Sequence, residues 1–397
     1  MVVKFTYNFT TMLYNEKMIR RSLAKFLSKT QKSILLLGPR QTGKSTLIQG
    51  LQPDLSINFA RENIFLDYSS QPNLLPELLK ANKARTIFID EVQRLPSILN
   101  TIQALIDDYP GQYKFYLTGS SARKLKRGNA NLLPGRVLLH YLGPLCSAES
   151  NYELNTAKAL MVGTLPEPYL GAPGESMKLL RSYAATYLRE EVQAEALTKN
   201  LEGFSRFLFI IAEQVAGLLD LSKASNQAKV PRQTALRFLE ILEDTLLVHR
   251  IWPYPKVASA DLVKHPKLYF FDVGVLNGLL GSFEVGQDRK GALFEQLFLS
   301  QLFASAAAAD VALSVWSFRT RGGLEIDFLV EVDGKKYAIE VNSGRSILTA
   351  DLKGLLASQK YLGKSWEYCL AYTGESERLV EGVHVRPWQT QLKKMGL

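Results

Sequence analysis

One stretch near the start of the chain combines glycines, a lysine and a hydroxyl at a spacing that suits phosphate binding. The run from Gly38 to Ser45 fits the pattern G-x-x-x-x-G-K-[ST]. Glycines let backbone amides wrap around a phosphate, because a Cβ would obstruct the approach. Lys44 would reach the β- and γ-phosphates, and the Ser45 hydroxyl would bind Mg²⁺. The predicted nucleotide contacts are Gly38, Pro39, Arg40, Gln41, Thr42, Gly43, Lys44, Ser45 and Thr46.

Two adjacent carboxylates follow a second apolar run. Thr86-Ile87-Phe88-Ile89 reads as a buried strand with Asp90 and Glu91 at its carboxyl tip. Two acids at a buried strand end are costly to place without a cation. Asp90 would therefore hold Mg²⁺, and Glu91 would polarise the attacking water. The guanine motif Asn-Lys-x-Asp is not matched, since the nearest run, 82–85, ends in arginine. ATP is therefore favoured over GTP.

Short apolar runs alternate with amphipathic stretches around these motifs. We expect strands at 33–37, 63–67, 86–90 and 113–118, and helices up to about residue 30, from Lys44, at 74–82 and at 98–109. Alternating strands and helices predict a parallel sheet wrapped by helices. The gly- and pro-rich run 162–174 marks a boundary, after which the chain reads as mostly helical to about residue 249.

The motifs together resemble AAA+-type P-loop ATPases. The resemblance rests on the phosphate motif, on Ile-Asp-Glu-Val-Gln-Arg-Leu-Pro at 89–96 and on the run 116–125, and it continues through 133–137 and 142–145. It is closest to a bacterial and archaeal group with a poorly characterised C-terminal region. It implies that Thr118 and Ser120 sense the γ-phosphate and that Arg136 is an arginine finger, with Arg123 as a rival. A finger acting on a neighbouring chain would require oligomers. The expected catalytic residues are thus Glu91, Lys44, Ser120 and Arg136.

The middle of the chain reads as helices at about 207–219, 221–226 and 231–246, followed by a strand at 248–252. This order resembles a winged helix-turn-helix, whose third helix would present Arg232, Gln233 and Arg237 to duplex DNA. The same fold also serves as a protein-binding or lid domain. An earlier helix, 183–191, also matches the family, and its Arg189 could face the nucleotide.

The last part returns to strands and helices and carries three acids. Glu295 lies on a predicted helix, and Asp327 and Glu340 lie on strands joined by an Asp333-Gly334 turn. This resembles a restriction-endonuclease-like core, in which such acids form a second Mg²⁺ site. The usual Glu-x-Lys is here Glu340-Val341-Asn342, so a degenerate nuclease fold kept for binding or assembly is favoured over cleavage. Lys336 or Lys353 could replace the missing lysine.

Composition bounds the remaining function classes. The chain has 397 residues, a formal net charge of +10 and a pI of about 9.3, which suits a polyanionic partner. Two distant cysteines make neither a disulfide framework nor a zinc pattern. The N-terminus does not resemble a signal peptide, and polar residues interrupt the apolar stretch 293–316. We expect a cytoplasmic protein without a membrane span.

These observations predict an α/β protein in three parts. Residues 1–165 would form a P-loop NTPase parallel-sheet domain, 166–285 a helical lid and winged-helix domain, and 286–397 an α/β restriction-endonuclease-like domain. We expect an ATP-hydrolysing switch that uses ATP and Mg²⁺ and acts on or binds double-stranded DNA, with a protein partner or a homo-oligomer also open. The alternatives are a nucleotide-gated protein-interaction scaffold, an ATP-dependent nuclease and, least favoured, a small-molecule kinase.

Overall fold

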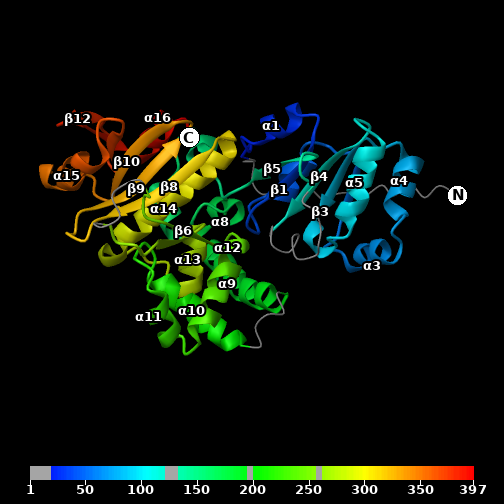
Figure 1. Ribbon diagram of the computed structural model, residues 1–397, viewed down its shortest axis with the longest axis horizontal. Coiled ribbons are helices and arrows are strands. Elements are labelled where there is room, and N and C mark those ends of the chain that lie inside the picture. Colours follow the sequence, from blue (N-terminus) through cyan, green and yellow to red (C-terminus); the bar gives the residue numbers. More distant parts are fainter. Residues whose placement is uncertain (1–18, 121–132, 195–199, 256–261) are drawn as a thin grey trace.

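The computed structural model describes residues 19–120, 133–194, 200–255 and 262–397 (Figure 1). Its first part is a five-stranded sheet in the order β2-β3-β4-β1-β5, and every pair is parallel. The predicted parallel sheet is therefore confirmed. The strands are β1 (Ser33–Leu37), β2 (Leu55–Asn58), β3 (Thr86–Asp90), β4 (Lys114–Gly119) and β5 (Val137–Tyr141). The surrounding helices are α1 (Ala24–Lys29), α2 (Lys44–Gln49), α3 (Glu62–Ser70), α4 (Leu74–Asn82), the short η1 (Val92–Arg94) and α5 (Ile98–Asp108).

Helices cover both faces of this sheet, and the side chains of β1 pack against them on each face. All five of its residues are buried. Side chains of a strand alternate between faces, so Leu35 and Leu37 join one apolar cluster, while Ile34 and Leu36 join another. A strand buried on both faces reads as a continuous apolar run, which is why Ser33–Leu37 could be located from sequence.

One strand prediction is wrong. Residues 63–67 lie inside α3, and the second strand of the sheet is Leu55–Asn58 instead. A short apolar run does not distinguish a strand from one buried face of a helix. Here Tyr68, one residue beyond the run, turns into the core against Phe59, as a helical period allows.

The middle part is mostly helical, with a two-stranded antiparallel sheet of β6 (Val248–Ile251) and β7 (Lys267–Phe270). Residue Leu218 adds an antiparallel bridge to Lys267. Three helices precede β6 in the predicted order, namely α10 (Leu201–Glu213), α11 (Leu221–Gln227) and α12 (Arg232–Asp244). The remaining elements are η2 (Ser147–Ser150), α7 (Thr156–Val162), α8 (Pro166–Leu170), α9 (Pro173–Ala194) and α13 (Val273–Leu280).

The C-terminal part is a six-stranded mixed sheet in the order β12-β13-β11-β10-β9-β8. A hairpin joins β9 to β10, and Asp333 and Gly334 both have positive φ (50° and 78°), as the predicted two-residue turn requires. Its elements are α14 (Gln287–Ala309), β8 (Leu313–Arg319), β9 (Glu325–Val332), β10 (Lys335–Asn342), η3 (Thr349–Leu352), α15 (Lys353–Leu362), β11 (Glu367–Tyr372), β12 (Arg378–Val380), β13 (Val383–Pro387) and α16 (Trp388–Met395).

Helix α14 joins the last two parts into one body. A single apolar cluster runs from Leu154 through α10, α12 and α13 to α14, β9, β10 and α16. By length and composition α14 could cross a membrane, but 72% of its apolar window is buried inside the molecule. Its apolar residues are therefore already covered by the protein core. In Figure 1 the first sheet lies on one side, and the middle and C-terminal parts lie together on the other.

Candidate functional site

The phosphate-binding motif forms a closed loop at the carboxyl end of β1. The Lys44 ammonium donates to the carbonyl oxygens of Gly38 at 2.9 Å and Pro39 at 2.8 Å, and Lys44 is only 6% exposed. The Thr42 hydroxyl also donates to Pro39 at 2.9 Å. The loop thus curls around its own lysine. Arg40 is half-buried, and Gln41 and Thr46 are exposed.

Both motif glycines are required by geometry. A Cβ on Gly38 would lie 2.2 Å from the carbonyl oxygen of Leu142, and Gly43 has a φ of +88°. A side chain at Gly38 would therefore collide with backbone, and one at Gly43 would strain it. Lack of space therefore constrains Gly38, and backbone conformation constrains Gly43. That is the arrangement expected of a cradle made from main-chain amides.

Side chains that carry oxygen atoms lie together where three strands of the sheet end. The Ser45 hydroxyl donates to the Asp90 carboxylate at 3.0 Å, and the Thr118 hydroxyl donates to the same oxygen. Asn58, at the end of β2, donates to the other Asp90 oxygen at 3.3 Å. Hydroxyl and carboxylate oxygens are the ligands that Mg²⁺ takes, so these residues fit a magnesium ion beside a triphosphate. Asn58 was not among the predicted site residues.

A glutamine completes the site. The Gln93 side-chain amide donates to the Glu91 carboxylate and, at 3.2 Å, to the Ser120 hydroxyl. Gln93 is 8% exposed, and its amide oxygen is buried without a hydrogen-bond partner among the described residues. Glu91 itself has a φ of 57°, which is uncommon for a residue with a side chain. Sequence reasoning missed Gln93, although it lies inside the motif 89–96.

Arg136 lies at the opposite edge of the sheet. Val137 pairs with Ser33 at the start of β1, whereas Tyr141 pairs with Leu37 next to the phosphate loop. Four residues of strand, roughly 13 Å, therefore separate Arg136 from the nucleotide edge of its own chain. Its guanidinium binds Asp107 of α5 at 2.7 and 2.8 Å and holds the pKa of that carboxyl below its usual value. Arg136 is therefore remote from the nucleotide edge of its own chain, and its role as an arginine finger toward a neighbouring chain stays a prediction.

Two other arginines cannot be placed in the site. Arg123, the rival for the finger, lies outside the described residues. Arg189 lies in α9, but its side chain also falls outside the part of the chain that the structure describes.

The three predicted acids of the C-terminal part meet, but around a lysine. Lys267 of β7 places its ammonium 3.0 Å from Glu295, 2.8 Å from Glu325 and 3.7 Å from Asp327. Within the described residues, no group of three or more His, Cys, Asp or Glu side chains is arranged to hold a metal ion. The predicted second metal site at Glu295, Asp327 and Glu340 is therefore corrected, because a buried ammonium supplies the positive charge there.

One lysine does not neutralise this acid cluster. Burial and the neighbouring carboxylates raise the pKa of Asp327 well above its usual value, and they raise the pKa of Glu340 to about 7. One Glu340 oxygen is buried without a partner among the described residues. The Tyr269 hydroxyl donates to Glu295. Lys336 does not replace the missing lysine, since it lies over the Trp366 ring, and the Lys353 alternative stays a prediction.

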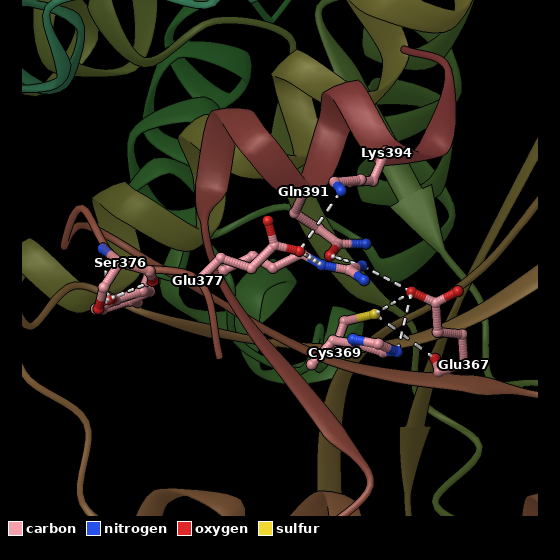
Figure 2. Close-up of polar contacts among 9 residues, drawn as sticks. Glu367, Cys369, Ser376, Glu377, Gln391 and Lys394 are labelled. Atoms are coloured by element: carbon pink, nitrogen blue, oxygen red, sulfur yellow. Dashed lines mark hydrogen bonds and ion pairs between the residues drawn. The ribbon is translucent and has the colours of Figure 1, made fainter. Parts of the chain in front are cut away.

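A second charged cluster at the far side of the same sheet is balanced (Figure 2). The Arg386 guanidinium donates to Glu367 at 2.7 Å, to Glu377 at 2.8 Å and to Gln391 of α16 at 3.0 Å. Lys394 adds a contact to Glu377 at 3.7 Å. These bonds join β11, β13 and α16, so this cluster is best explained as a structural support for the sheet edge.

The predicted DNA contacts lie on one exposed side of α12. Arg232, Gln233 and Arg237 are exposed, whereas Ala235, Phe238 and Leu239 of the same helix are buried. The helix therefore has a polar face and a core face, as its 3.6-residue period requires. All three predicted residues are available at the surface.

Family comparisons support the reading of the first part. Residues 30–151 match a family model described as an AAA domain. The first part of the chain is an AAA-type nucleotide-binding ATPase domain. Residues 154–285 and 290–390 match two further family models, each described only as a domain of unknown function. Of the three matched family models, only the AAA model has a description that indicates a function.

Individual relatives are more distant. The chain is 27% identical over 314 residues to uncharacterized proteins of Mycobacterium tuberculosis and Mycobacterium bovis, covering 78% of this chain and 69% of theirs. A solved replication initiator DnaA bound to AMPPCP and single-stranded DNA is 14% identical, with a TM-score of 0.27, over 56% of this chain and 85% of that one. A STAND-type signal transduction ATPase of Pyrococcus horikoshii is 12% identical, with a TM-score of 0.26, over 74% and 47%.

Proposed function

We propose that the AAA domain binds ATP with Mg²⁺, hydrolyses it, and uses its nucleotide state to act on the middle and C-terminal parts. The observation that carries this proposal is the buried Lys44 ammonium inside the 38–43 loop, next to the Ser45–Asp90 hydrogen bond. A cation and a magnesium-ligand pair at one strand edge match the needs of a triphosphate. The working units are residues 1–165, 166–285 and 286–397.

Each site residue has a distinct role in this proposal. Lys44 binds the β- and γ-phosphates, and Ser45 and Asp90 hold the metal. Mg²⁺, when bound, neutralises charge on the phosphate oxygens. Glu91 orients the attacking water as a carboxylate base, and Gln93 fixes that carboxylate relative to Ser120. Ser120 and Thr118 lie where a γ-phosphate or the water would be sensed.

The decisive test is turnover with and without metal. Purified chain should release phosphate from ATP in Mg²⁺ and stop in excess EDTA. Glu91→Gln should keep ATP affinity but lose hydrolysis by about 10²-fold or more, because the amide cannot accept a proton. ATP turnover of Glu91→Gln equal to wild type would refute the assigned base, and no ATP binding by wild type would refute the ATPase proposal.

A second proposal concerns nucleic acid. The exposed face of α12 with Arg232, Gln233 and Arg237, on a chain of net charge +10, favours contact with duplex DNA. DNA binding should weaken steeply with salt, and Arg232→Ala should lower both affinity and the salt slope. Lys364→Ala, at an exposed lysine of the C-terminal part, serves as the control. If duplex DNA neither binds the protein nor stimulates ATP turnover, the protein-interaction scaffold is favoured over a DNA-acting protein.

The remaining alternatives have their own signatures. ATP that stays bound through purification with negligible turnover would favour a nucleotide-gated scaffold. Mg²⁺-dependent DNA cleavage that is lost in Asp327→Ala would favour a nuclease, against the Lys267-filled acid cluster. An ATP turnover rate per chain that rises with protein concentration, and that falls in Arg136→Gln, would favour a homo-oligomer. In that case Arg136 would contact the nucleotide of a neighbouring chain.

A further inference from the structure

Arg21 lies directly behind the phosphate loop and uses much of its donor capacity there. Its guanidinium donates to the Thr42 carbonyl at 2.5 Å, to the Gly143 carbonyl at 2.9 Å and to the Pro144 carbonyl at 3.2 Å. Its Nε donates to the Glu149 carboxylate at 2.9 Å. The fork-shaped guanidinium is the side chain that can meet several acceptors at once. Arg21 thus joins three chain segments at one point.

The Arg21–Glu149 pair is buried. The Arg21 side chain is 9% exposed and that of Glu149 is fully buried. Glu149 also accepts the backbone amides of Ser22 at 2.9 Å and Cys146 at 3.2 Å, so its charge is hydrogen-bonded on both oxygens. A buried ion pair contributes little net stability, because desolvation offsets its attraction, and it is better evidence for a specific geometry than for a stable fold.

The geometry that Arg21 fixes is that of the loop amides. A trans peptide is planar, so the carbonyl oxygen of Thr42 and the N–H of Gly43 point in opposite directions. Holding the Thr42 carbonyl toward Arg21 turns the Gly43 N–H away from it. Gly43 has φ +88° and directly precedes Lys44, so a rotation of this peptide would also displace the lysine and Ser45. Arg21 therefore controls the orientation of the cradle.

The other end of this contact reaches the C-terminal part. The segment 142–150 follows β5, which lies on the side of the AAA domain that faces α14 in Figure 1. The Ser147 amide donates to Gln301 of α14 at 2.8 Å, and Gln301 donates back to the Leu145 carbonyl at 2.8 Å. A Cβ on Gly143 would lie 3.2 Å from Ala304 of the same helix. The segment is therefore fitted closely to α14.

We propose that Arg21 is a positioning residue that ties the orientation of the phosphate loop to the docking of segment 142–150 on α14. Nucleotide affinity then depends on how that segment sits on the C-terminal part, although Gln301 touches no part of the phosphate loop. This inference rests on the proposed ATP site and adds the device that regulates it.

The test measures ATP·Mg²⁺ affinity by isothermal titration calorimetry in a Glu91→Gln background, so that the ligand is not consumed. Arg21→Gln should weaken binding about tenfold or more, since hydrogen bonds from a charged group are lost. Arg21→Lys should fall between, because it keeps the charge without the fork. Arg206→Gln is the matched control, since Arg206 also binds a carbonyl and a carboxylate but lies in the middle part.

The link to α14 is tested by a double-mutant cycle. Gln301→Met should weaken ATP binding alone but add little in the Arg21→Gln background, because both changes release the same segment. Melting temperatures without nucleotide report general loss of fold, and Arg21→Lys and Gln301→Met keep the test valid if Arg21→Gln does not fold. Fully additive effects, or Arg21→Gln affinity within about twofold of its parent, would overturn the inference. No binding by the parent would instead overturn the ATP proposal.

Discussion

Two charged regions of this molecule are each built around a buried lysine. Lys44 of the AAA domain donates to the carbonyl oxygens of Gly38 and Pro39. Lys267 of β7 lies against the carboxylates of Glu295, Glu325 and Asp327. Carbonyl oxygens carry only partial charge, whereas carboxylates carry a full negative charge that offsets the charge of an ammonium. The same side chain therefore indicates a binding site in one region and internal support in the other.

The largest expected effect is at the AAA lysine. Lys44→Ala should lower ATP hydrolysis by about 10³-fold, since it removes the cation that stabilises charge on the transferred phosphoryl group. Its melting temperature without nucleotide reports any general loss of fold. Lys80→Ala, at an exposed lysine of α4, is the control for phosphate release. Hydrolysis by Lys44→Ala near the wild-type rate would break the comparison.

Lys267 should show the reverse pattern. Lys267→Met should lower the free energy of unfolding by about 3–5 kcal/mol, because it leaves the buried Asp327 and the partly buried Glu295 and Glu325 without their cation. Urea unfolding measures this, and ATP affinity should change little in the protein that remains folded. Arg319→Gln is the control, since Arg319 contacts Glu325 from an exposed position at 3.2 Å. Equal losses of unfolding free energy in the two variants would contradict the role of Lys267 in stabilising the acid cluster.

Gln93 should affect catalysis without affecting binding. Gln93→Leu should lower kcat about tenfold or more and leave ATP affinity unchanged, because it frees the Glu91 carboxylate from its fixed place beside Ser120. Phosphate release and calorimetry separate the two quantities. Gln103→Leu, at a half-buried glutamine of α5, controls for the substitution itself. A change in affinity with constant kcat would place Gln93 among the binding residues instead.

The acid cluster should also make stability depend on pH. The pKa of Glu340 is raised to about 7, so the folded state holds a proton that the unfolded state releases near pH 4.5. The stability from this proton is present below pH 4.5 and is lost as pH rises through 7. Burial lowers the pKa of His249 to about 4, so its contribution to the stability of the folded state rises with pH between about 4 and 6.5 and is constant above that. Glu340→Gln should therefore flatten urea stability between pH 6.5 and 8, and an unchanged slope would contradict this.

The sequence located the features that lie within single short motifs. The phosphate loop, β1, β3 and α4 were found at their observed bounds, because apolar runs and glycine spacing are local signals. The strand at 63–67 was wrong for the same reason, since a short run with three apolar residues suits a strand or a helix equally. Local pattern is sufficient where the pattern is specific, and it fails where it is short.

Apart from the hydrogen bond between Gln93 and Glu91, the missed contacts described above join residues that are distant in the chain. Lys267 is 60 residues from Asp327, and its only local sign is a charged residue at the start of an apolar strand. Arg21 is 128 residues from Glu149. Arg136 follows a turn like a finger, but only strand register showed which edge of the sheet it occupies. Pairings of this kind depend on tertiary packing, which no spacing rule expresses.

The apolar cluster that runs from Leu154 to α16 limits how the middle and C-terminal parts can be exchanged between related proteins in evolution. Residues 154–285 and 290–390 match separate family models, yet neither could be exchanged for a foreign counterpart without exposing half of a common interior. The AAA domain has its own interior, although its segment 142–150 packs against α14. Recombination among relatives should therefore break the chain near residue 150 and keep everything beyond it together.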